Sequence, residues 1–399
     1  MIRRIIRFYI FFTFARNFFF SLPFATYFLY LQSRGMNMFQ LSVIKFACML
    51  SIFLFEIPTG AFADLYGRKK SFLLSLLLIS IAYVVYSISD TFLMFIFLEI
   101  FIGFSLTFFS GAFISWVIDS LKFFGFVERL DTVISKGQIA VNSGMVMGGL
   151  VGAYLAKTDM RIPWIIGGIG TLCLFVLTIL STKEYTDKIE NKNVAKEKVY
   201  TKLINISKDS ITYGFKNKNV MRLVGGIIVF GIFTMPLNVY WQPYFQNTFK
   251  LPIEFMGWIN TSNHLSLILG TLILSYFSKK SFYSSKKSIL LSLLIIGSPF
   301  CFIYFANLSF LPILFLFQLH EIGRGLFLPS HTSLFNESIP SEKRATLNSF
   351  LSMMSMLGYA LGSFLFGRIA YFCGIKFSWL CVSVILMLSI IFYEGIKEK

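Results

Sequence analysis

The chain alternates between long apolar runs and short polar stretches. The runs at 72–89 and 289–306, for example, are almost wholly apolar. About 20 consecutive apolar residues are enough for an α-helix to cross a bilayer. A membrane β-barrel would instead show segments of about 10 residues with alternating polarity. The pattern therefore predicts membrane-spanning helices rather than strands.

Turn residues and charges divide the sequence into twelve apolar segments. The expected spans are 5–31, 38–63, 71–89, 92–118, 133–156, 163–180, 221–246, 254–276, 289–306, 310–334, 346–372 and 375–394. The first segment follows Arg3, Arg4 and Arg7, as the apolar part of a signal peptide would. It is too long for that, and no small-residue cleavage site follows it, so we interpret it as a span.

The two halves of the chain repeat. Gly144 and Gly148 in the fifth segment recur as Gly358 and Gly362 in the eleventh, 214 positions later. We therefore expect an all-α polytopic membrane protein with 12 transmembrane helices in two pseudo-symmetric six-helix bundles. The expected domains are an N-terminal bundle, a cytoplasmic linker and a C-terminal bundle, at 1–180, 181–220 and 221–399. A substrate path is expected between the bundles, near the midplane of the membrane.

Composition agrees with lipid as the main solvent. Of 399 residues, 56% are hydrophobic and 14% are charged, whereas soluble domains carry about 25% charged residues. The five cysteines lie in apolar segments without disulfide or metal spacing. The sequence has no Walker-type phosphate loop, no metal-ligand cluster and no nucleophile–base arrangement. We expect no catalytic residues, no metal and no cofactor, and a protein that is not an enzyme.

Basic residues set the orientation. With the N-terminus inside, the inner segments hold 27 lysines and arginines and the outer loops hold 5. This asymmetry predicts that both termini are cytoplasmic in a bacterial-type plasma membrane. It also explains the net charge of +17: much of the basic charge faces the inner leaflet, and nucleic acid is not needed as a partner. Apolar residues within the lysine-rich linker, among them Leu203, Ile204, Ile211 and Phe215, predict an amphipathic helix on the membrane surface.

The loop after the second segment has the sequence GAFADLYGRKK at 60–70. Gly60 and Gly67 permit close helix approach and a tight turn, and Asp64 and Arg68 can make charge-assisted hydrogen bonds. The stretch resembles the signature loop of the major facilitator superfamily, G-x-x-x-D-x-x-G-R-K-x, and segment number, orientation and half-repeat extend the resemblance over the whole chain.

The resemblance implies that this loop acts as a latch for the outward-open state. Asp119, at the inner end of the fourth segment, is similar to the acidic partner of the latch arginine, here Arg68. The alternative is that Arg68, Lys69 and Lys70 serve only to set the topology.

The fifth segment contains Gly144, Gly148, Gly149 and Gly152, whose small size favours close helix packing. This stretch is similar to G-x-x-x-G-P-x-x-G-G, the antiporter motif of drug-exporting members of the family. Gly149 replaces the proline and Ala153 the last glycine, so the export signal is degraded. Small residues at this spacing also occur in membrane helices that have no role in antiport.

Charged residues inside the spans are costly and usually functional. Glu56 and Glu321 are candidate proton carriers, and Arg16 and Arg324 complete the proton-coupling candidates. Alternatively, Glu321 and Arg324, three positions apart on one helix face, form a structural ion pair. Glu56 would then pack against Arg16 or Lys45.

The fourth span lacks an arginine that many members of the family carry there, because Glu99 occupies its place. A proton mechanism that needs this arginine therefore does not apply to this protein. Glu99 lies near the outer end of its span and is expected to face water.

Uncharged polar residues supply the substrate-cavity candidates. These are Asn17, Asn238, Gln242 and His264. Most aromatic residues near the outer helix ends are expected to form an interfacial belt; they are Tyr27, Tyr30, Tyr240, Trp241 and Tyr244.

The resemblance implies a secondary transporter that works by alternating access. We expect proton-coupled export of a small lipophilic compound such as a drug. The expected partners are this small-molecule substrate, the proton and the lipid bilayer, with the protein as a monomer; sodium remains open as coupling ion. The alternatives are an uptake transporter for a sugar, peptide or metabolite, and a membrane scaffold or enzyme on the same fold. Substrate identity does not follow from fold.

Overall fold

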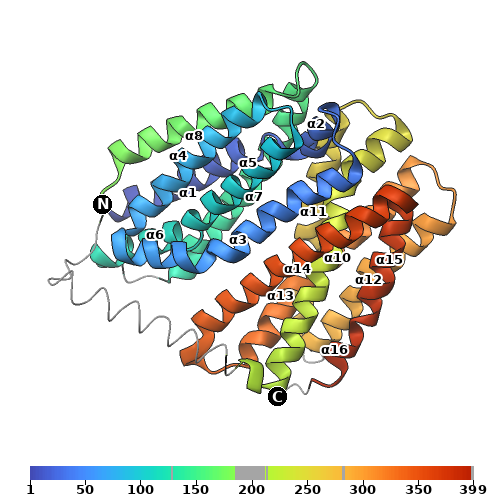
Figure 1. Ribbon diagram of the computed structural model, residues 1–399. Helices are drawn as coiled ribbons and strands as arrows, with labels where there is room; N and C mark the ends of the chain where they lie inside the picture. Colours follow the sequence, from blue (N-terminus) through green and yellow to red (C-terminus); the bar gives the residue numbers. More distant parts are fainter. Residues whose placement is uncertain (127–128, 185–211, 213, 281–283, 397–399) are drawn as a thin grey trace. The chain divides into compact units, whose positions relative to one another are not determined.

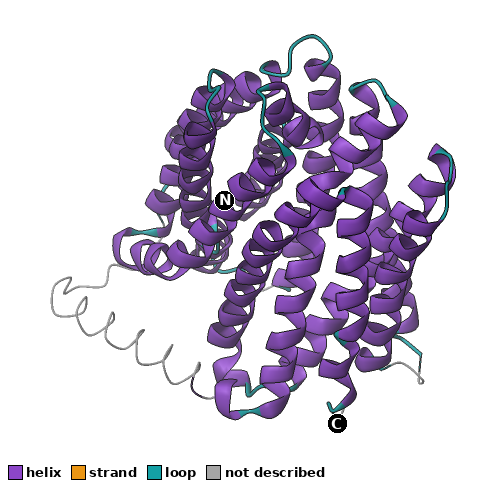
Figure 2. Cartoon of the chain, turned by 45° about the vertical axis from the view of Figure 1, so that its right-hand side comes forward, coloured by secondary structure: helices purple, strands orange, loops and turns teal. Residues whose placement is uncertain are grey.

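The computed structural model describes every residue except 127–128, 185–211, 213, 281–283 and 397–399. All regular structure in the described part is helical (Figure 2). This confirms the predicted fold class. Most of the amphipathic helix predicted in the linker lies outside the described residues.

The helices follow the predicted segments closely. The first half contains α1 (Ile2–Ser21), η1 (Phe24–Thr26), α2 (Tyr27–Ser33), α3 (Met38–Tyr66), α4 (Arg68–Ser87), α5 (Phe92–Phe109), α6 (Ala112–Phe123), α7 (Leu130–Ala156) and α8 (Ile162–Ser181). The second half contains α10 (Lys218–Phe249), α11 (Glu254–Phe277), α12 (Ser285–Phe305), α13 (Phe310–Glu337), η2 (Ser341–Lys343), α14 (Arg344–Cys373), α15 (Ile375–Leu388) and α16 (Ile390–Glu394).

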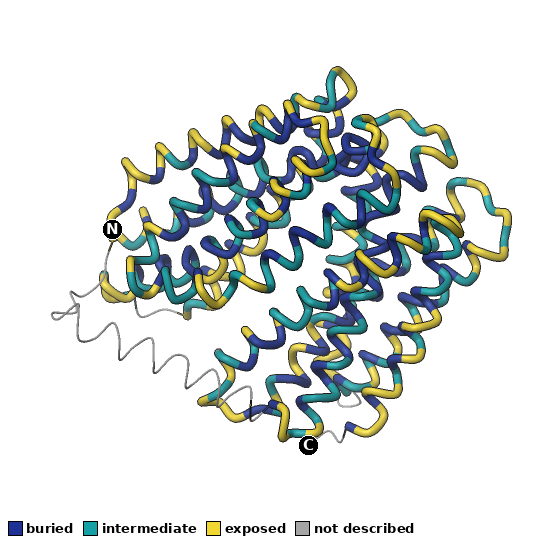
Figure 3. Tube along the Cα trace, in the orientation of Figure 1, coloured by how far each residue is buried: buried dark blue, intermediate teal, exposed yellow. Residues whose placement is uncertain are grey.

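Within the described residues, 11 helical segments are long and apolar enough to cross a membrane. The eighth predicted span, α11, does not meet this measure because the polar run 260–264 lies within it. Exposed residues lie all along the helices (Figure 3). Many of them are large and apolar; Leu93, Leu180 and Phe305 are 76%, 81% and 79% exposed. Exposed apolar surface on this scale marks a lipid-facing molecule rather than a water-soluble one.

The fourth span departs from its prediction. The sequence predicts one helix over 92–118, whereas the structure breaks it at Ser110 and Gly111, between α5 and α6. Gly111 has φ +70°, a left-handed conformation that glycine adopts without steric cost. The N–H of Ala112 bonds to the carbonyl of Ser110 at 2.8 Å instead of continuing the helical ladder.

The chain divides into two compact units. The first holds Met1–Met36, Leu50–Tyr200 and Lys250–Thr261, and the second holds Asn37–Met49, Thr201–Phe249 and Ser262–Lys399. Relative to the two predicted bundles, the units exchange the beginnings of α3 and α11. In the first unit, α4 and α8 lie side by side (Figure 1).

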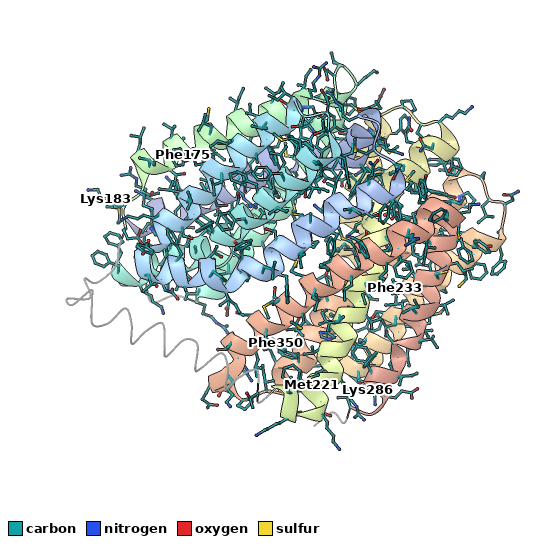
Figure 4. All side chains as sticks on the ribbon, in the orientation of Figure 1. Phe175, Lys183, Met221, Phe233, Lys286 and Phe350 are labelled. Carbon is teal, nitrogen blue, oxygen red and sulfur yellow. The ribbon has the colours of Figure 1, made fainter. Side chains whose placement is uncertain are left out.

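Each unit has its own apolar core. Aromatic rings of Phe12, Phe72 and Trp116 are buried together in the first unit. In the second, Phe233 lies midway along α10, and Met221 and Lys286 lie at one end (Figure 4). The Lys286 ammonium closes that end by donating to the carbonyl oxygens of Glu394 and Ile396, at 2.7 and 3.0 Å.

Glycines let α7 approach the backbone of α1. A Cβ added at Gly144, Gly148 or Gly152 would lie 2.5, 2.3 or 1.7 Å from a carbonyl oxygen of α1 or the turn after it. A Cβ at Gly149 would lie 2.3 Å from the amide nitrogen of Asn260 in α11. A larger residue at Gly144, Gly148 or Gly152 would meet this backbone and force the helices apart, whereas at Gly149 it would displace the Asn260 side chain.

The second unit repeats this packing. A Cβ at Gly358 or Gly362 of α14 would lie 2.4 Å from the carbonyl oxygen of Ile228 or 2.1 Å from that of Ile232, both in α10. Ile228 and Ile232 lie 214 positions after the α1 residues that the corresponding α7 glycines contact. The sequence repeat therefore corresponds to a repeated helix–helix contact.

Candidate functional site

A buried ion pair lies within α13 of the second unit. Arg324 Nη1 donates to Glu321 Oε1 at 2.8 Å, and the two side chains are 13% and 7% exposed. The same Nη1 donates to Asn238 Oδ1 of α10 at 3.1 Å. The structure thus joins three predicted site residues. Gln242, one turn further along α10, is also buried.

Polar residues of α11 and α13 extend this cluster. Gln318 Nε2 donates to Ser262 Oγ and to Asn263 Oδ1, both at 2.9 Å. His264, a predicted cavity residue, follows Asn263 in α11. Sequence reasoning did not select Gln318, Ser262 or Asn263. Their signal was present, because each is a polar residue deep within an otherwise apolar segment.

The cluster has unused hydrogen-bonding capacity. Gln318 Oε1 and Arg324 Nε are buried and have no hydrogen-bond partner among the described residues. Leaving a buried polar atom unsatisfied costs about 1–3 kcal/mol. Such atoms, next to a charged pair and several amides, are suited to bind a polar ligand group. No group of three metal-ligating side chains lies together in the described part of the chain.

Two other predicted charged residues lie in the first unit. Glu56 Oε1 accepts a hydrogen bond from Ser110 Oγ at 2.7 Å, at the break in the fourth span. Arg16 Nη1 donates to Asn17 Oδ1 at 3.3 Å, and Asn17 Nδ2 donates to the carbonyl of Thr13 at 2.7 Å. Glu56 and Arg16 do not form an ion pair with each other, and the alternative packing of Glu56 against Arg16 or Lys45 stays a prediction.

The loop at 60–70 brings Arg68 to Asp119, and the two form an ion pair. Gly67, with φ +106°, directly precedes α4. Glu184, which sequence reasoning missed, accepts a hydrogen bond from the backbone N–H of Lys69 at 3.0 Å. Desolvation raises the pKa of the Glu184 carboxyl, and the hydrogen bond from Lys69 opposes that shift. An acid shortly after the sixth span was the available sequence signal.

Two further residues of this loop have open surroundings. Asp64 is exposed and makes no hydrogen bond or ion pair with any described residue. A Cβ added at Gly60, inside α3, would meet nothing within 4 Å. Their open surroundings contrast with those of Arg68, which is paired with Asp119.

The expectations for the outer aromatic residues are wrong. Tyr27, Tyr30, Tyr240, Trp241 and Tyr244 are at most 7% exposed, so they do not form a belt facing the lipid headgroups. Sequence position gives the depth of a residue in the membrane but not the face of the helix it occupies.

Glu99 is likewise buried, at 2% exposure, rather than facing water. Its Oε1 accepts a hydrogen bond from the Tyr27 hydroxyl at 2.9 Å. Tyr86 bonds to the same hydroxyl at 3.2 Å and stacks on Trp164 with ring centroids 3.9 Å apart. Tyr27, which was expected at the interface, instead donates a hydrogen bond to this buried acid.

The model of the Major Facilitator Superfamily matches this sequence over residues 8–251 and 222–398. The chain belongs to the major facilitator superfamily. It is a multi-pass membrane protein of a transporter family, as the signature loop at 60–70 indicates.

Relatives and solved structures agree with this assignment. The MFS-type transporter YxaM of Bacillus subtilis strain 168 is 24% identical over 383 residues, covering 93% of this chain and 90% of that protein. Multidrug resistance protein 2 of the same organism is 22% identical over 319 residues, covering 77% and 75%. The crystal structure of the nucleoside transporter NupG superposes with a TM-score of 0.82 at 16% identity, covering 98% of this chain and 100% of that chain. At that identity the superposition shows the shared major facilitator fold alone.

Proposed function

We propose that this protein exports small organic compounds from the cell by alternating access, driven by protons moving inward. It acts as a monomer in the plasma membrane, with both termini cytoplasmic. The observation that carries the proposal is the buried polar cluster around Glu321 and Arg324, because charges inside membrane spans are retained for substrate and ion pathways. The likeness to multidrug resistance proteins supports export.

Glu56 is the better of the two candidate proton carriers. Its recorded partner is the neutral hydroxyl of Ser110, so it can change charge without breaking an ion pair. Protonation of Glu321 would leave Arg324 buried without its counter-charge, which is strongly unfavourable. Glu321 therefore serves to hold Arg324 in place.

Uptake of a hydrogen-bonding metabolite is the second candidate. A purely lipophilic cargo would not use the open acceptor of Gln318 or the open donor of Arg324. These atoms favour a cargo with polar groups, which fits import as well as export.

Transport in everted membrane vesicles tests the proposal. An acid-inside gradient is imposed, and accumulation of fluorescent lipophilic probes and of labelled nucleosides and peptides is followed. We expect gradient-driven accumulation of at least one lipophilic probe, abolished in Glu56→Gln and retained in Glu337→Gln, which changes an exposed acid at the end of α13. Accumulation of none of the lipophilic probes overturns export, and full gradient-driven transport by Glu56→Gln overturns the assignment of Glu56. Uptake of a polar solute into right-side-out vesicles supports the second candidate.

A further inference from the structure

The fourth span is discontinuous inside the membrane. α5 ends at Phe109, α6 begins at Ala112, and no side chain caps the first turn of α6. The first N–H groups of a helix have no intrahelical acceptor and carry the positive end of the helix dipole. The break therefore presents a fixed partial positive charge at Ser110 and Gly111, both of which are exposed.

Arg16 of α1 adds a full positive charge beside this break. Its Cζ lies 4.3 Å from the ring centroid of Phe109, the last residue of α5, and 4.6 Å from that of Phe20. Its single hydrogen bond to an oxygen, among the described residues, goes to Asn17 at 3.3 Å. A guanidinium has five N–H donors, so most of its capacity is unused.

No carboxylate among the described residues pairs with Arg16, whereas Arg324 in the other unit is paired with Glu321. Aromatic rings stabilise a cation through their faces, but they do not replace the strong hydrogen bonds of an oxyanion. Arginines at membrane depth face the bundle interior or a water-filled space and take a partner there. The acid at the break, Glu56, is held by Ser110 and does not supply that partner.

We propose that the break at Ser110–Gly111 and Arg16 together bind the oxyanion of an aromatic organic acid, a carboxylate or a phosphate, with its ring against Phe20 and Phe109. Half-helix N-termini in other transporters point at anionic substrate groups in the same way. That this acid is transported rests on the proposed function, whereas its binding at this site does not. The substrate class is then amphipathic: a lipophilic ring with one anionic group.

Thermal unfolding of the purified full-length protein tests the proposal. Tm is measured against concentration of benzoate, phenyl phosphate and benzamide, which share a ring and differ in the charged group. We expect benzoate or phenyl phosphate to raise Tm with saturation and benzamide to leave it unchanged; the stronger of the two anions identifies the preferred oxyanion. Arg16→Gln is expected to weaken anion binding about tenfold or more, since it removes a charged hydrogen-bond donor.

Arg368→Gln is the matched control. Arg368 of α14 also lies over a phenylalanine, Phe372, with Cζ 6.0 Å from the ring centroid, but it is exposed and distant in sequence from the break. Its substitution is expected to leave anion binding unchanged. If Arg16→Gln elutes as aggregate, Arg16→Lys provides the test. Lysine keeps the charge but loses the bidentate geometry, so the affinity of this variant for the anions must fall severalfold.

The proposal is overturned if neither anion raises Tm, if benzamide acts equally, or if Arg16→Gln or Arg16→Lys binds the anions as the wild type does. Anion binding without gradient-driven transport would overturn the proposed export and retain this site. Transport of neutral probes without anion binding would retain the proposed export and overturn this site.

Discussion

Arg16 and Arg324 both lie deep within spans of this transporter, and their partners differ. Arg324 is fixed by Glu321 and Asn238, whereas Arg16 has two phenylalanine rings and one amide. The sequence identifies both arginines as costly and therefore functional. The sequence does not show which of the two arginines is neutralised by an acid. A partner for Arg16 would have to come from another segment, and several residues of other segments lie at the same depth in the membrane.

The Glu321–Arg324 pair is expected to support stability strongly. Arg324→Gln leaves Glu321 buried without a counter-charge, which costs about 3–5 kcal/mol. Arg34→Gln breaks the pair with Asp90, whose side chain is 64% exposed, and exposed pairs are worth about 0–1 kcal/mol. We therefore expect Arg324→Gln to lower Tm well below that of Arg34→Gln, with partial recovery in the double variant Glu321→Gln/Arg324→Gln. Equal Tm values for the two single variants would contradict this.

Glu56 and the proposed anion are expected to compete at the break. Ser110 already donates its hydroxyl to Glu56, so an arriving oxyanion meets a like charge there. Glu56→Gln removes that charge and should bind benzoate at least as tightly as the wild type, even though it loses gradient-driven transport. The Tm titration with benzoate measures this; a loss of binding as large as that of Arg16→Gln would show that Glu56 builds the anion site instead.

At the scale of elements, the length of the apolar runs and the turn residues between them predicted the spans well, because a helix in lipid must satisfy its own backbone and be long enough to cross. The break in the fourth span was missed. Ser110 and Gly111 are small residues in an apolar run, and such residues also occur inside continuous membrane helices. The burial of Tyr27 and Glu99 was missed because depth in the membrane does not specify which helix face points inward.

The glycines of α7 are expected to be required for its contact with α1. A Cβ at Gly152 would lie 1.7 Å from the carbonyl oxygen of Leu22, while a Cβ at Gly60 would meet nothing within 4 Å. Gly152→Ala should therefore destabilise the protein by about 1–3 kcal/mol through overpacking. Gly60→Ala should leave stability unchanged or raise it by up to about 1 kcal/mol, since alanine favours a helix. Tm measurements on the two variants decide this, and an unaltered Tm for Gly152→Ala would contradict it.

At the scale of the whole molecule, the half-repeat relates the two polar centres. Ser110 and Gly111 lie 214 positions before Arg324 and Gly325, and Glu56 lies the same number before Gly270. In the second unit a Cβ at Gly270 would lie 3.1 Å from Gly325 Cα; in the first unit Glu56 accepts a hydrogen bond from Ser110, the residue before the equivalent of Gly325. The two units thus differ in chemistry around these related positions: the second has the Glu321–Arg324 ion pair, and the first has a helix break beside an acid.

Asp64 provides the test of a conformational cycle. It is exposed and bonded to no described residue in this structure, so its removal should not affect the stability of this conformation; surface substitutions of this kind change stability by about 0.5 kcal/mol or less. The resemblance of its loop to the family signature implies that Asp64 is engaged in a different conformation. We therefore expect Asp64→Asn to keep the wild-type Tm while losing most gradient-driven transport in everted vesicles. Asp131→Asn, which changes another exposed acid of the same unit, should keep both. A residue that is needed in one conformation of a transport cycle cannot be removed without slowing the cycle. Full transport by Asp64→Asn would therefore contradict the latch and leave the loop with a role in topology alone.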